Sequence, residues 1–258
     1  MTSPDLVVPA APAGTPTLWR LVAYTAVLAA AELLLAVSVP GAAVLLALLV
    51  VLLRFALPAP GAPGTAVIPV LIGVPVVRLL TLAAPGAEVP SPVRAAGLAV
   101  PVLLTALLAA RGRPPDWRLL RPGPDGWRVQ VLVALAGIPL AVPVYLLAGR
   151  AMADFGGLPW PLAAALLAVA VIPDELLFRG LLVPALGAVA PRAAVPLAAG
   201  VYAAAFLGYL SVPIVAAAYG TGFALGWLRR RTGSAVGVIA ARVVLIGLVC
   251  GAASALAH

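Results

Sequence analysis

Two carboxylates and an arginine stand close together in a stretch of the chain that is otherwise apolar. Asp174, Glu175 and Arg179 are the ionisable residues of positions 162–186. Glu175 and Arg179 are four residues apart, so in a helix they share one face, with the acid on the N-terminal side. A carboxylate in such a setting can act as a general base, and an arginine can stabilise an oxyanion. Because an ionisable group at membrane depth is costly, the cluster predicts either a functional site or a buried charge network.

Pro173 comes directly before the acidic pair. Proline donates no backbone hydrogen bond, so the helix loses one bond at this turn and a carbonyl group is left free. We therefore expect a kinked membrane helix that carries Asp174, Glu175 and Arg179 at its weak point.

The composition of the whole chain indicates an integral membrane protein. Of its 258 residues, 64% are hydrophobic and 9% are charged, and the mean hydropathy is +1.17. A soluble domain is about 25% charged, so this chain has too little polar surface for a water-soluble globule. The net charge of +8 comes from arginines that separate the apolar runs and form no basic face, which argues against nucleic acid as a partner. The single cysteine, Cys250, excludes an intramolecular disulfide and a cysteine-based metal site.

The chain divides into about nine apolar runs of the length that a membrane-spanning helix needs. They follow a tail at residues 1–17 that we expect to be disordered, and they lie at 18–39, 41–58, 65–84, 93–110, 129–149, 161–186, 191–210, 212–229 and 234–256. Prolines crowd the junction of the second and third runs, and a short turn joins the seventh to the eighth. We predict an all-α, polytopic membrane helical bundle of about eight to nine transmembrane helices, in which residues 18–258 form a single transmembrane domain.

Arginine placement predicts how these helices are oriented. With a cytoplasmic N-terminus, the inner ends of the runs receive most arginines that lie between runs, including those within 111–128 and 229–231. The outer ends receive Arg94 and Arg150. Since cytoplasmic loops carry an excess of arginine, we predict a multi-pass protein of the cell membrane whose C-terminus is outside.

Two further charges lie within the predicted spans. Glu32 is in the middle of the first run and is either paired with Arg78 or neutral. Arg54 and Arg78 lie near the ends of their runs, so we expect their side chains to extend to the membrane surface.

Three motifs, in this order and spacing, resemble the CPBP family of membrane proteins, the CAAX-protease and bacteriocin-processing group. They are DELLFRG at 174–180, GVYAAAFLGYL at 200–210 and GTGFALGWLRRRTGSAVGVIAARVVLIGL at 220–248. The resemblance covers about 162–248 and includes the type II CAAX prenyl endopeptidases. It implies a CAAX-protease-like core and cleavage of a membrane-presented or prenylated peptide near its C-terminus, or maturation of a small peptide.

The acidic motif keeps most of the family pattern, which is Glu-Glu-x-x-x-Arg. Asp174 stands at the first glutamate, whereas Glu175 and Arg179 match. The resemblance implies that Asp174 or Glu175 is the base that activates water and that Arg179 orients Glu175.

The histidine motifs of the family, Phe-x-x-x-His and His-x-x-x-Asn, are not kept. Tyr202 and Phe206 occupy the first motif in the register that helix depth favours, and Phe206 and Leu210 occupy it in the other. Arg242 and Ile246 stand at the histidine and asparagine of the second motif. We expect Arg242 to be an oxyanion donor, and Tyr202, Phe206 and Ile246 to line the same cavity.

The missing histidines decide what we expect of cofactors. A catalytic zinc ion normally has three protein ligands, and this chain offers Asp174 and Glu175 in the helix core, while its one histidine, His258, is the last residue. We therefore predict no metal, although the family can use zinc.

The sequence leaves two functions open. The first is a CPBP/CAAX-type intramembrane endopeptidase that is impaired or inactive, because Phe206 and Arg242 occupy the expected histidine positions. The second is a non-enzymatic membrane scaffold that binds a lipid or a partner helix with the same cavity. In that case Asp174, Glu175, Arg179 and Arg242 form a buried network of zero net charge. Membrane lipid is an expected partner of both.

Overall fold

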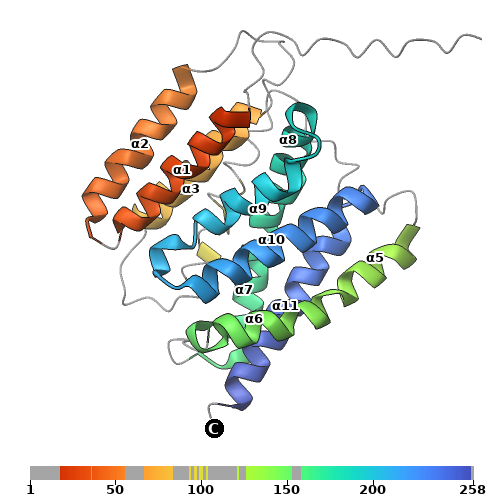
Figure 1. The fold of residues 1–258 in the computed structure, drawn as a ribbon. Helices are drawn as coiled ribbons and strands as arrows, with labels where there is room; N and C mark the ends of the chain where they lie inside the picture. Colours follow the sequence, from red (N-terminus) through yellow and green to blue (C-terminus); the bar gives the residue numbers. More distant parts are fainter. Residues whose placement is uncertain are drawn as a thin grey trace, which may run out of the picture.

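The fold is known from a computed structural model, which describes residues 18–35, 37–55, 67–83, 93, 96–97, 99–100, 103, 121, 126–152 and 158–256. Within those ranges the regular structure is entirely helical, as predicted (Figure 1). The α-helices are α1 (Leu18–Leu35), α2 (Val39–Phe55), α3 (Val67–Ala83), α5 (Gly126–Leu135), α6 (Gly137–Met152), α7 (Trp160–Glu175), α8 (Val183–Val189), α9 (Ala194–Ala204), α10 (Val212–Thr232) and α11 (Val236–Ala255). A π-helix, η3 (Leu176–Leu182), joins α7 to α8, and a 3₁₀ turn, η4 (Leu207–Tyr209), follows α9.

Where the structure describes them, most of these helices overlap the predicted runs, although the runs at 129–149 and 191–210 are each divided into two elements. In the part of the chain that the structure describes, three helical stretches are long and apolar enough to cross a membrane, at Gly126–Gly149, Trp160–Val189 and Val236–Ala255. Shorter apolar helices lie at Val39–Leu53, Val67–Leu80 and Ala194–Tyr209. The protein is therefore a helical membrane protein. The predicted tail at 1–17 and most of the run at 93–110 lie outside the described residues.

The run predicted at 191–210 is not one regular helix. Its α-helical part, α9, ends at Ala204, and Leu210 after η4 has a left-handed backbone conformation with φ of 50°. Such a conformation ends a helix and turns the chain, because an L-residue tolerates it only singly. Gly208 lets this turn approach α1 closely, since a Cβ there would lie 3.2 Å from an oxygen of Glu32.

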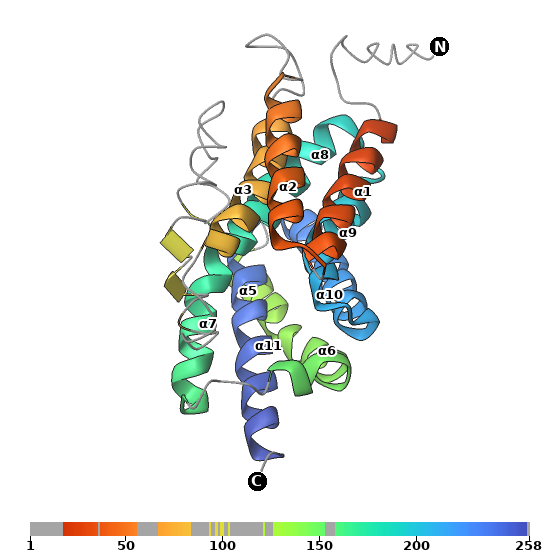
Figure 2. The same cartoon turned by 90° about the vertical axis from the view of Figure 1, so that its left-hand side faces the viewer.

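The helices are arranged in two groups with a shared middle (Figures 1 and 2). Helices α1, α2 and α3 pack side by side, and α1 also contacts α9 and η4. On the other side, α11 contacts α5, α6 and α7. Between the groups, α10 packs against both α9 and α6. The residues of the three predicted motifs thus lie at the junction between the two groups.

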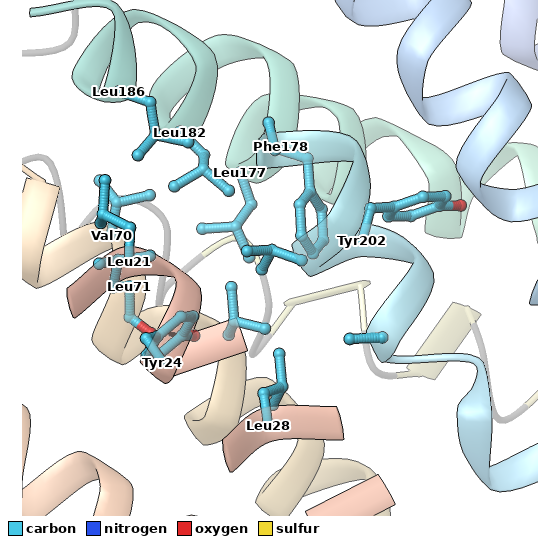
Figure 3. Close-up of a cluster of buried hydrophobic side chains, with 14 of the residues drawn as sticks. Leu21, Tyr24, Leu28, Val70, Leu71, Leu177, Phe178, Leu182, Leu186 and Tyr202 are labelled. Carbon is cyan, nitrogen blue, oxygen red and sulfur yellow. Dashed lines mark hydrogen bonds between the residues drawn. The ribbon is translucent and has the colours of Figure 1, made fainter. Parts of the chain in front are cut away.

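A hydrophobic core connects the first three helices to the segment that carries the acidic motif (Figure 3). Leu28 of α1, Leu71 of α3 and Leu177 of η3 are buried in one cluster, together with Tyr202 of α9. The hydroxyl group of Tyr24 donates a hydrogen bond of 2.8 Å to the carbonyl oxygen of Leu71, which satisfies a polar atom inside this core. The packing therefore fixes how α1 and α3 are placed relative to η3 and α9.

Contacts at the helix ends agree with helices that alternate in direction. Arg230 at the end of α10 donates a hydrogen bond to the carbonyl oxygen of Pro191, just before α9. At the opposite end of the bundle, the start of α7 lies beside the last turns of α11. A Cβ atom at Gly251 would be 3.8 Å from the ring of Trp160. The arginines predicted to be cytoplasmic at 192 and 229–231 therefore share one end.

Helix α6 depends on a glycine to pack against α11, which leads to a first prediction. A Cβ at Gly137 would overlap the backbone carbonyl of Ala241 and lie 3.1 Å from Cβ of Val244. We expect Gly137→Ala to lower the free energy of unfolding by about 1–3 kcal/mol, because backbone atoms cannot move aside. Thermal unfolding in detergent micelles measures this loss. Gly247→Ala on α11 is the matched control, since no atom lies within 4 Å of its Cβ, and equal destabilisation by both changes would contradict the prediction.

Candidate functional site

The helix that carries the acidic motif is irregular just after the two acids. Helix α7 continues through Pro173 to Glu175, and the π-helical segment η3 starts at Leu176. The backbone nitrogen of Leu176 still bonds the carbonyl groups of Ile172 and Pro173. The wider turns thus begin three residues after Pro173, immediately after the acids, and the kink at Pro173 itself stays a prediction. Since π-helical turns are rare and frequently occur at functional sites, this geometry marks the segment that presents Arg179.

Glu175 and Arg179 form a buried ion pair. Nη1 of Arg179 lies 3.1 Å from Oε1 of Glu175, and the two side chains are 2% and 1% exposed. The guanidinium carbon of Arg179 also lies 4.3 Å from the centre of the Tyr202 ring, which favours the cation through the ring's π-electrons. Within the described part of the chain, Oε2 of Glu175 has no hydrogen-bond partner. Glu175 is therefore paired with Arg179 through one of its two carboxylate oxygens.

The side chain of Arg242, which belongs to α11, also contacts Tyr202. Its Nη2 donates a hydrogen bond of 2.5 Å to the hydroxyl oxygen of Tyr202 on α9. The positive charge of Arg242 also interacts with the carboxylates of Asp174 and Glu175. Arg242 thus lies at Tyr202, whose ring also faces Arg179, and its charge acts on both acids of α7.

Two aromatic rings pack against the ring of Tyr202. The rings of Phe178 and Phe206 each meet the Tyr202 ring edge to face, with ring centres 5.0 and 5.2 Å away. Figure 3 shows Phe178 and Tyr202 facing each other from η3 and α9. Phe206 follows the end of α9, so the favoured register puts both of its motif residues in contact.

Ile246 lies one helical turn beyond Arg242 and is buried in a different apolar cluster. That cluster includes Val171 of α7 and Val249 of α11. Its observed role is packing between α7 and α11. That Tyr202, Phe206 and Ile246 line a cavity stays a prediction.

Asp174 differs from its neighbour Glu175. It is half-buried, and among the described residues it takes part in no hydrogen bond or ion pair. Three positive charges act on it all the same, those of Arg242, Arg179 and Arg78. Among the described residues Asp174 is therefore a carboxylate without an ion-pair partner, and the negative charge of Glu175 acts on it together with the three arginines. The sequence does not distinguish it from Glu175 in this respect.

Arg78 belongs to a second ion pair, which settles a question that the sequence leaves open. Its Nη2 donates a hydrogen bond of 2.6 Å to Oε2 of Glu32, and its Nε donates to Oε1. Glu32 is 0% exposed and Arg78 is 21% exposed. The expectation that Arg78 extends to the membrane surface is wrong, because the buried carboxylate of Glu32 holds it; the side chain of Arg54 lies outside the described residues.

The donor set does not fit a catalytic zinc ion. Across the described ranges, no three side chains of histidine, cysteine, aspartate or glutamate gather in one place. Asp174 and Glu175 supply two oxygen ligands at most, where a catalytic zinc site normally has three protein ligands. His258 lies outside the described residues.

Comparison with known protein families gives one match over this part of the chain. Residues 156–247 match the type II CAAX prenyl endopeptidase Rce1-like family. No curated protein and no solved structure matches the chain. The matched range includes α7 to most of α11 and nearly coincides with the core predicted at 162–248. Residues 156–247 therefore form an Rce1-like region consistent with the CPBP family, within a helical membrane protein.

Proposed function

We propose that this protein is an intramembrane endopeptidase of the CAAX prenyl type in which Asp174 activates water. The observation that carries the proposal is the unpaired carboxylate of Asp174 inside the Rce1-like region, next to Arg242. Glu175 is the weaker candidate for the base, because its carboxylate is engaged by Arg179. Arg179 orients Glu175 and neutralises it.

The chemistry needs only a base and a group that stabilises the oxyanion. Asp174 accepts a proton from water while the water oxygen bonds to the carbonyl carbon of the scissile peptide. The carbonyl oxygen becomes an oxyanion, and the guanidinium of Arg242 stabilises it by charge and hydrogen bonding. The carbon–nitrogen bond then breaks as Asp174 returns the proton to the leaving amine. No step passes through a metal, in keeping with the donor set.

The expected substrate is a prenylated or otherwise membrane-presented peptide that is cut near its C-terminus. The Rce1-like match and the apolar helices support this substrate class over a soluble one or nucleic acid. We place the protein in the cell membrane, surrounded by lipid, with its N-terminus and the arginine-rich end of the bundle in the cytoplasm. Because Phe206 and Arg242 replace the family's histidines, we expect slow turnover.

The test is cleavage of a farnesylated tetrapeptide by the purified protein in micelles, with the released tripeptide measured by mass spectrometry. We expect Arg242→Gln to lower the rate by about a hundredfold to a thousandfold, because one donor to the oxyanion is lost. Arg230→Gln is the matched control, since Arg230 bonds Pro191 far from the site. A rate for Arg242→Gln equal to that of the control would contradict the assigned role.

A non-enzymatic scaffold is the second candidate, and one observation favours it. The charges of Asp174, Glu175, Arg179 and Arg242 cancel, which is how a bilayer tolerates a purely structural network. The same assay separates the two functions. A scaffold releases no tripeptide under any condition, although it binds the farnesylated peptide or lipid.

A further inference from the structure

The three arginines whose charges act on Asp174 have one property in common. Each of them is held by a different side chain. The pairs are Arg78 with Glu32, Arg179 with Glu175, and Arg242 with Tyr202. Asp174 is the carboxylate of this group that no arginine bonds among the described residues.

We infer that Glu32 is a positioning residue of the site: it holds Arg78 and thereby keeps the carboxylate of Asp174 unpaired. The inference rests on the proposed role of Asp174 as the base. It deepens that role by adding a residue from α1, far outside the Rce1-like range of 156–247.

The geometry of Glu32 suits this task. Both of its carboxylate oxygens accept hydrogen bonds from Arg78, a two-point contact that fixes the plane of the guanidinium. The carboxylate is fully buried, and the turn at Gly208 closes over it, with 3.2 Å between the glycine's built Cβ and Oε2. Glu32 therefore has little freedom to move away from Arg78.

Arg78 has the reach and the charge to compete for Asp174. It comes from α3, which contacts η3, the segment that begins two residues after Asp174, and it already acts on Asp174 through its charge. An arginine is a permanent cation, so without Glu32 its charge is uncompensated in an apolar bundle. Asp174 is then a carboxylate on which the charge of Arg78 already acts, and pairing with it would remove the base from the reaction.

The experiment compares Glu32→Gln, Arg78→Gln and the double variant Glu32→Gln/Arg78→Gln in the full-length protein. The first readout is the rate at which a hydrophobic carbodiimide modifies Asp174, measured by mass spectrometry of the peptide that contains it. The second is hydrolysis of the farnesylated tetrapeptide. The carbodiimide readout needs no peptidase activity, so it tests the inference even if the proposed function fails.

We expect Glu32→Gln to slow both modification of Asp174 and hydrolysis by about tenfold, because Arg78 turns to Asp174. Arg78→Gln and the double variant should each lose clearly less than Glu32→Gln does, since in them no arginine is released to pair with Asp174. Recovery of both rates when Arg78→Gln is added to Glu32→Gln separates this mechanism from simple loss of a packing contact. If packing alone were lost, the double variant would be at least as slow as Glu32→Gln.

Two results would overturn the inference. One is equal modification of Asp174 in Glu32→Gln and in the unchanged protein, and the other is equal loss in Glu32→Gln and the double variant.

If Glu32→Gln does not fold, Glu32→Asp takes its place, because its shorter side chain keeps the charge but loosens the contact. Asp174 modification should then fall by a smaller factor and recover in Glu32→Asp/Arg78→Gln, and a rate unchanged in Glu32→Asp overturns the inference. If modification of Asp174 changes among the variants as expected but no tripeptide is released, the proposed function is refuted and the inference about Glu32 is not.

Discussion

Asp174→Asn removes nearly all peptide hydrolysis, by about a hundredfold to ten-thousandfold, which is what a positioned general base contributes. Asparagine has nearly the same shape but cannot accept a proton from water. Because Asp174 is half-buried and bonds no arginine among the described residues, its replacement breaks no ion pair. The fold should therefore survive, and a thermal unfolding curve close to that of the unchanged protein is part of the expected result.

The control for this prediction is Asp174→Glu. Glutamate keeps the carboxylate and restores the residue type of the family motif, so hydrolysis should persist at a rate similar to or higher than that of the unchanged protein. The measurement is again tripeptide release from the farnesylated peptide. Retained activity in Asp174→Asn would remove Asp174 from the mechanism and return the role of the base to Glu175.

Glu175→Ala has its largest effect on stability. The change leaves Arg179, which is 2% exposed, as a buried charge without a carboxylate partner. Removing one member of a buried pair typically costs about 3–5 kcal/mol, so the protein should unfold at a markedly lower temperature in micelles. Part of this loss is reduced by the ring of Tyr202, which still faces the guanidinium.

The double variant Glu175→Leu/Arg179→Met is the control for that loss. Apolar residues of similar volume replace both charges, so most of the stability should return, because no charge is left uncompensated. If Glu175→Ala and the double variant unfold at the same low temperature, the loss comes from packing of η3 and not from the unpaired Arg179. An unfolding temperature of Glu175→Ala equal to that of the unchanged protein would contradict the buried pair itself.

Local features of the chain were predictable because they depend on neighbouring residues. The apolar runs predict the helices, since a bilayer requires internally bonded segments of a certain length. The spacing of Glu175 and Arg179 predicts their contact, because residues four apart meet on one face of a helix. The Rce1-like region was also visible in the order and spacing of three motifs, although its histidines are replaced.

The sequence predicts an irregular helix near the acids, but it does not predict where the irregular turns lie. Proline at 173 indicates a weak point, but the π-helical turns run from Leu176 to Leu182. Their position depends on how η3 packs against α1, α3 and α9, where Leu177 and Leu182 are fully buried. A proline in the sequence does not carry that information.

The difference between Asp174 and Glu175 was decided by tertiary structure alone. The sequence shows two adjacent carboxylates, and it leaves open which is the base. Helix α9 supplies Tyr202, which holds Arg242 across 40 residues of sequence, and α1 supplies Glu32, which holds Arg78 across 46. Hydrophobic periodicity states which face of a helix is buried, but not which other helix it meets. Only the packed bundle therefore shows that, among the described residues, Arg78, Arg179 and Arg242 each have a side-chain partner and Asp174 has none.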